Sequence, residues 1–218
     1  MRTLFDRLKN YTWAKLFIIY TRYLIGFAFV HASLPKIMGE RFTRIPIDNP
    51  VGFYFEAMYQ SGFYWNFLGW SQMIAAVLIM TQRYATLGAI LFLPIITNVF
   101  LVTWSIGFVG TPVVTFFMFL ATVMLLVWEY DRLKVLLPAD NQAISMQYKP
   151  DPFMHKPIWI YQGFAIIALV LFADLTTVEK TVKSISIFIL LISVSVTAFY
   201  FLFRKKSEQF SDGSFNRV

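Results

Sequence analysis

The sequence predicts an all-α integral membrane protein in which a four-helix transmembrane bundle forms the core and a further pair of transmembrane helices is appended. Composition is the first reason, because 58% of the 218 residues are hydrophobic and only 14% are charged, whereas about 25% are charged in a typical soluble domain. Length is the second, because six apolar runs approach the roughly 20 residues that a helix needs to cross a bilayer. The third is the unequal distribution of Lys and Arg among the connecting segments.

The six apolar runs define the domain organisation. We expect spans at 16–38, 63–80, 84–106, 111–130, 158–174 and 185–203. The first four form a core over 16–130, and the polar, proline-containing segment 131–157 separates this core from the additional helix pair over 158–203. Polar segments at 1–15 and 204–218 flank the whole. Because 1–15 is too polar for the hydrophobic region of a signal peptide, we expect the first span to remain in the mature protein.

The segment 40–62 is too rich in aromatic residues for a plain linker. Asp48 or Asn49 followed by Pro50 is a typical helix start, and Gly62 is a typical stop. We therefore expect a short helix at about 50–60 that lies on the outer surface of the membrane or dips into it.

The positive-inside rule favours a cytoplasmic location for both termini. In that orientation 13 of the 19 Lys and Arg residues lie in inner segments. The five outer ones are Lys36, Arg41, Arg44, Lys180 and Lys183. High usage of Phe, Ile and basic residues indicates a bacterial plasma membrane, with the chain as a multi-pass protein.

Several function classes are excluded or disfavoured. The chain has no Cys, which excludes disulfides and thiolate metal sites, and its two His residues disfavour bis-histidine haem ligation. The chain has no HExxH spacing and no Ser–His–Asp set on one side of the membrane, so a hydrolase is disfavoured. The net charge of +7 is explained by basic residues that face anionic membrane lipid. We expect no nucleic-acid partner and no metal.

The end of the first span contains three residues that packing in lipid does not require: His31, Pro35 and Lys36. Pro35 removes the hydrogen-bond donor for the carbonyl of His31, so this turn is expected to face other helices or a cavity. Ionisable residues within membranes are commonly functional, but His31 can equally serve to hydrogen-bond a neighbouring helix. Lys36 is near the outer rim and can extend toward the membrane surface.

The first span also carries one continuous helical stripe. Its members follow at steps of four and three residues: Arg22, Gly26, Phe29, Ser33 and Lys36. Small residues on such a stripe allow a neighbouring helix to approach closely.

Polar residues on the other core spans are expected to face the bundle interior, where they would form a modest pocket in its outer half near His31, Gln72 and Asn98. The ligand-binding candidates are His31, Gln72, Asn98, Trp104, Lys36 and Arg22. Structural alternatives remain for them. Gln72 and Asn98 also suit hydrogen bonds between helices, and Arg22 and Lys36 also suit anchoring at the interface. Glu129, Asp131 and Arg132 are expected on a solvated inner rim, and His155 on the surface.

These residues resemble a pattern of the DoxX family of small polytopic membrane proteins. The first-helix pattern is an Arg, a Gly-x-x-Phe and a Lys, here Arg22, Gly26–Phe29 and Lys36 within RYLIGFAFVHASLPKIMG. The second and third helices match over LGWSQMIAAVLIMTQRYATLGAILFLPI, so the resemblance covers 16–130. Where many relatives carry a carboxylate in the second helix, this chain has Gln72, which puts any proton or redox role of that acid in doubt here.

The resemblance implies a four-helix bundle and association with membrane redox systems. Some family members are subunits of quinone-linked oxidoreductases that act on sulfur compounds, or partners of oxidative-stress proteins, and distant ones are cargo receptors and receptor-assembly chaperones. The expected function is therefore a membrane subunit associated with a quinone-linked oxidoreductase or another redox complex. It would bind a small apolar ligand such as quinone in the bundle. The chain itself would be at most a non-catalytic or quinone-binding subunit, with no cofactor of its own.

Two other functions stay open. One is a non-enzymatic membrane protein for binding, assembly or chaperoning, for which the aromatic outer segment would provide a partner surface. The other is a small-molecule transporter, which ranks lowest because Pro35 and Pro94 interrupt two helices without any repeat between the two halves of the chain.

Overall fold

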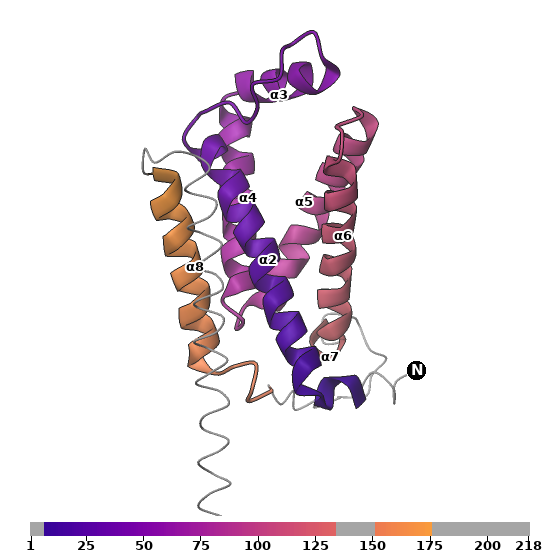
Figure 1. Cartoon of the computed structure of the whole chain (residues 1–218), viewed down its shortest axis with the longest axis vertical. Helices are drawn as coiled ribbons and strands as arrows, with labels where there is room; N and C mark the ends of the chain where they lie inside the picture. Colours follow the sequence, from indigo (N-terminus) through magenta and orange to yellow (C-terminus); the bar gives the residue numbers. More distant parts are fainter. Residues whose placement is uncertain (1–6, 134–150, 176–218) are drawn as a thin grey trace, which may run out of the picture.

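Five helices that are long and apolar enough to cross a membrane dominate the computed structural model, which describes residues 7–133 and 151–175 (Figure 1). These are α2 (Thr12–Ile37), α4 (Phe63–Met80), α5 (Ala85–Ser105), α6 (Thr111–Trp128) and α8 (Pro157–Leu175). Two short helices, α3 (Pro50–Gln60) and α7 (Tyr130–Leu133), lie at opposite ends of the bundle. All regular structure in the described ranges is helical, as composition predicts for a multi-pass membrane protein. The expected sixth span, 185–203, lies outside the described residues.

The short helix α3 begins at the expected signal. The side chain of Asn49 accepts a hydrogen bond from the backbone N–H of Val51 at 2.9 Å, and Pro50 occupies the first helical position, where its missing N–H costs nothing. The chain then turns into α4 through Ser61 and Gly62, whose φ of +59° suits glycine. We refer below to the two ends of the bundle as the α3 end and the α7 end.

The closest packing in the bundle is that of α2 against α4. All five residues of the predicted stripe on α2 are buried, which confirms the stripe. Gly26 leaves no room for a side chain, because a Cβ atom there would overlap the side chain of Met80. Because lipid tails are as apolar as the side chains, such close backbone approach, rather than the hydrophobic effect, holds membrane helices together. α5 packs on α4 and α6, and α8 packs on α2.

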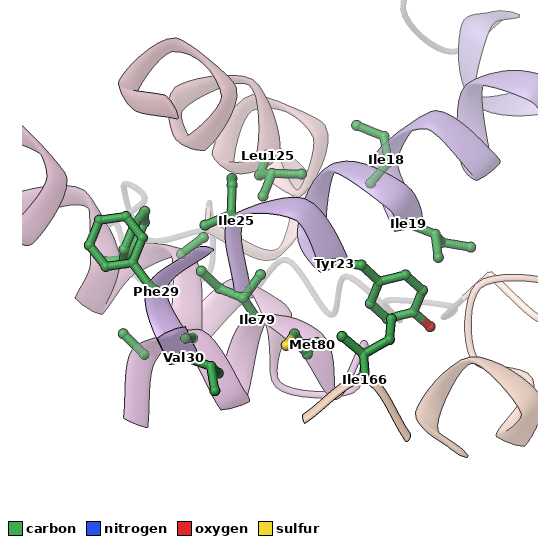
Figure 2. Close-up of a cluster of buried hydrophobic side chains, with 14 of the residues drawn as sticks. Ile18, Ile19, Tyr23, Ile25, Phe29, Val30, Ile79, Met80, Leu125 and Ile166 are labelled. Carbon is green, nitrogen blue, oxygen red and sulfur yellow. The ribbon is translucent and has the colours of Figure 1, made fainter. Parts of the chain in front are cut away.

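A cluster of buried apolar side chains ties α2, α4, α6 and α8 together (Figure 2). Ile25 on α2 lies beside Ile79 on α4 and Leu125 on α6, and all three are at most 2% exposed. Ile166 brings α8 against the same cluster. The core therefore lies deep in the bundle, away from its α3 end.

Helices α2 and α6 meet only sparingly and diverge toward the α3 end (Figure 1). Their contact involves Leu125, in the half of α6 nearer the α7 end. Closer to the α3 end, the rings of Phe29 and Phe92 meet edge to face, with centroids 4.4 Å apart. Beyond this aromatic pair the helices separate, and the space between them is not filled by the core.

Candidate ligand cavity

A cavity of about 700 Å³ occupies this space. Its walls come from residues 28–36 of α2, 64–74 of α4, 91–103 of α5 and 111–118 of α6, and α3 contributes Tyr54, Phe55 and Met58. At a rise of 1.5 Å per residue, the cavity extends about 12 Å along α2 and about 18 Å along α5. Its lining is mostly apolar, and its volume is within the roughly 300–1,000 Å³ of small-molecule sites.

Lys36 is the charged residue that lines the cavity, and it is only 4% exposed. Its ammonium group donates to the carbonyl of Ala32 and lies 4.3 Å from the ring centroid of Phe42 and 5.4 Å from that of Trp65. These are cation–π distances. Among the described residues, no carboxylate lies within ion-pair distance of it. The expectation that Lys36 extends outward to the membrane surface was therefore wrong.

The position of Lys36 is fixed by the adjoining turn of α4. Gly69 lets α4 approach so closely that a Cβ atom there would lie 2.8 Å from Cβ of Lys36 and 2.9 Å from the backbone nitrogen of Ile37. Oriented to satisfy its hydrogen bonds, the amide nitrogen of Asn66 lies 3.0 Å from the carbonyl oxygens of both Lys36 and Ile37 and caps the end of α2. Trp65 is held in turn by a 2.9 Å hydrogen bond from its indole nitrogen to the carbonyl of Glu40.

Gln72 and Asn98 line the same cavity. Gln72 is 3% exposed, and its Oε1 atom has no hydrogen-bond partner in the described part of the chain. A buried, unsatisfied amide is costly, and more so at membrane depth, where water cannot replace the missing partner. Toward the α3 end, Thr103 and Thr115 join α5 to α6, with their hydroxyl oxygens 3.2 Å apart.

The cavity is open at its side. Phe67, Ile74 and Leu91 line it and are nevertheless 57%, 51% and 43% exposed. They belong to adjacent helices, α4 and α5, so the mouth lies between these two.

The structure brings Lys36, Gln72 and Asn98 together but places His31 elsewhere. Nδ1 of His31 lies 2.8 Å from Oδ2 of Asp174 on α8, and the side chain is 63% exposed. One helical residue corresponds to a turn of about 100°, so the step from Ala32, which lines the cavity, to His31 moves the side chain off that face. The expected pocket shared with His31 is corrected accordingly. Trp104 is 68% exposed and is also not in the lining.

Arg22 belongs to a second polar cluster, at the α7 end. Its guanidinium donates to Gln82 and to Glu129, at 2.8 Å each. Arg132 Nε lies 3.1 Å from the other carboxylate oxygen of Glu129, and a second nitrogen of Arg132 lies 2.9 Å from Nε2 of His155. We call these five residues the α7-end network.

The α7-end network changes two expectations. Arg22 is 1% exposed, so it is not an anchor at the membrane interface. Glu129 is 9% exposed, so it does not lie on a solvated rim. His155 is half-buried and engaged with Arg132. The network joins α2, the α4–α5 turn, the residue that caps the end of α6, α7 and the segment before α8, and none of its members lines the cavity. Its geometry is that of a structural clamp.

Sequence reasoning missed the aromatic partners of Lys36, namely Phe42 and Trp65. The aromatic richness of 40–62 was a signal, but nothing local indicated that these rings fold back over the end of α2. In the described ranges no group of three or more His, Asp or Glu could hold a metal ion.

Comparison with known proteins does not identify the chain: no protein-family model matches it, and neither a curated protein nor a solved structure matches it.

Proposed function

We propose that the protein is a membrane-embedded ligand-binding subunit that takes a lipid-soluble small molecule with a polar head, such as a quinone, into the cavity at the α3 end. The observation that carries this proposal is the combination of an apolar cavity of about 700 Å³, open at its side, with the polar groups of Lys36, Gln72 and Asn98 in its lining. A protein that needed only to span the membrane would fill this space with side chains.

The chemistry of the lining suits a quinone. The ring would lie against apolar and aromatic walls that include Phe29 and Phe55, and its carbonyl oxygens need donors. The ammonium of Lys36 and the amide nitrogens of Gln72 and Asn98 are donors of this kind. We assign ligand binding to this chain and the redox reaction to a partner subunit.

The wider setting is part of the same proposal. The resemblance of 16–130 to the DoxX family favours a role beside a quinone-linked oxidoreductase, and the excess of basic residues in one set of segments favours a bacterial plasma membrane with both termini cytoplasmic. In that orientation the α3 end, with its cavity, faces the outer leaflet. The helix pair at 158–203 completes the proposed four-plus-two arrangement.

A titration with a short-chain benzoquinone tests the proposal. The full chain in nanodiscs is titrated while its tryptophan fluorescence and thermal midpoint are recorded. Quinone at 100 times its Kd is expected to stabilise the protein by about 2.7 kcal/mol, or about 5–10 °C. Ala32→Phe, which fills the cavity, should abolish the shift. Leu24→Phe, on a lipid-exposed position of the same helix, should leave it intact. Absence of any quinone effect on the wild type would refute quinone binding.

An assembly role is the second candidate. Ile47, Phe53 and Phe63 at the α3 end are 66%, 66% and 85% exposed, which favours contact with another membrane protein. Crosslinking in native membranes followed by mass spectrometry tests it, and recovery of this chain alone would count against it.

A further inference from the structure

We propose that the cavity selects an anionic amphiphile, a long-chain carboxylate, whose head group pairs with Lys36 and whose chain extends along the apolar walls between α2, α4, α5 and α6. This inference rests on the proposed ligand-binding function and adds the charge and the chemical class of the preferred ligand.

The charge balance of the two buried cations on α2 differs. Arg22 and Lys36 are both buried cations on α2, at 1% and 4% exposure. Arg22 has the carboxylate of Glu129 at 2.8 Å, whereas the partners of Lys36 are a backbone carbonyl and two aromatic rings. A buried charge is normally compensated by an opposite charge, because removal from water is otherwise expensive. In the described part of the chain that counter-charge is missing at Lys36, and the side chain lines a cavity in which a ligand can supply it.

A second polar group, the amide of Gln72, lines the same cavity. Gln72 follows Gly69 by three residues, so it lies about one turn along α4 from the point where that helix touches Lys36. One end of its amide is buried without a partner. Because Gln72 lines the cavity, its amide nitrogen can donate to one carboxylate oxygen while Lys36 holds the other.

The rest of the cavity is long and apolar. On α2 the cavity wall consists of Ala28 and Ala32 as well as Phe29 and Lys36, and the two alanines leave room that larger side chains would fill. The wall continues about 18 Å along α5 through residues such as Ile95 and Val99. A single acyl chain matches an apolar space of this length. In the proposed membrane orientation the open side between α4 and α5 faces the acyl region of the bilayer, where such amphiphiles reside.

A matched pair of ligands tests the inference. The full chain in nanodiscs of neutral phosphatidylcholine is titrated with palmitate and with hexadecanol, which share one chain and differ in head-group charge. We expect palmitate to bind at least about tenfold more tightly, since hydrogen-bonded charge pairs are stronger than neutral contacts. Lys36→Met should abolish the preference and Lys36→Arg should restore most of it. Arg44→Met, which removes one exposed charge outside this cavity, should leave it unchanged.

The outcomes separate this inference from the proposed function. Equal affinity of the wild type for palmitate and hexadecanol would overturn charge selection while leaving ligand binding in place, as would tight binding of a quinone without binding of palmitate. Failure of all three compounds to bind would overturn both. The wild-type comparison alone decides the question if Lys36→Met does not fold, which size-exclusion chromatography and circular dichroism would show.

Discussion

Substitution of Glu129 by Gln tests the α7-end network most sharply. Glu129 is 9% exposed and faces two cations, Arg22 at 2.8 Å and Arg132 at 3.1 Å. The substitution keeps the shape of the side chain but removes its negative charge, and it replaces one of the two acceptor oxygens that face Arg22 and Arg132 by an amide nitrogen, which donates. Arg22, at 1% exposure, would then be buried without the carboxylate that the structure pairs with it.

Removal of one partner of a buried ion pair costs about 3–5 kcal/mol, mostly because the remaining charge is left uncompensated. For a chain of this size, each kcal/mol corresponds to about 2–4 °C in the thermal midpoint. We therefore expect Glu129→Gln to lower the midpoint by about 6–20 °C. The assay is thermal unfolding in detergent, followed by tryptophan fluorescence at one fixed scan rate, because membrane proteins commonly unfold irreversibly.

A matched control comes from the same end of the molecule. Asp131 pairs with Lys9 at 3.0 Å, but the two side chains are 48% and 23% exposed. Asp131→Asn should cost no more than about 1 kcal/mol, as surface ion pairs do. Equal midpoints for the Glu129 and Asp131 variants would refute the view that burial makes the α7-end network a clamp.

Three further predictions concern packing, pH and the histidine in α2. Gly26→Leu should cost about 1–3 kcal/mol by overpacking against Met80, and an unchanged thermal midpoint would contradict the close approach of α2 and α4. Burial raises the pKa of Asp151, but hydrogen bonds from Lys15 and from two backbone N–H groups outweigh it and hold the pKa below its usual value. Because the folded pKa is the lower one, the stabilisation is complete above the unfolded pKa of about 3.9 and is lost as pH falls through the folded value. Denaturant titrations between pH 3 and 7 should show this loss in the wild type and less of it in Asp151→Asn, and identical profiles would disprove it. His31→Leu should leave palmitate and quinone affinity unchanged, because the side chain lies outside the cavity, and a loss as large as that of the lysine variant would place it at the site after all.

Local signals were sufficient for the helices and for the face of α2 that is buried. Apolar runs of spanning length, the Asn49–Pro50 start and the 3.6-residue period of the α2 stripe each involve residues close in sequence, and each reports directly on burial or backbone geometry. The expected range of about 50–60 coincides closely with α3 at Pro50–Gln60. The sequence also predicted that Gln72 and Asn98 face the bundle interior, and both line the cavity.

The sequence by itself thus determined that the chain is helical, that its helices are long and apolar enough to cross a membrane, and which stripe of α2 is buried. It could do so because apolar length and the helical period are properties of residues close together in the sequence. The tertiary structure alone decided what each polar side chain meets. Arg22 finds Glu129 across 107 positions, Lys36 turns inward beneath two aromatic rings, and His31 pairs with α8. The physical reason is that a step of one residue turns a side chain by about 100°, so its partner depends on which helices pack on each side and how far they diverge.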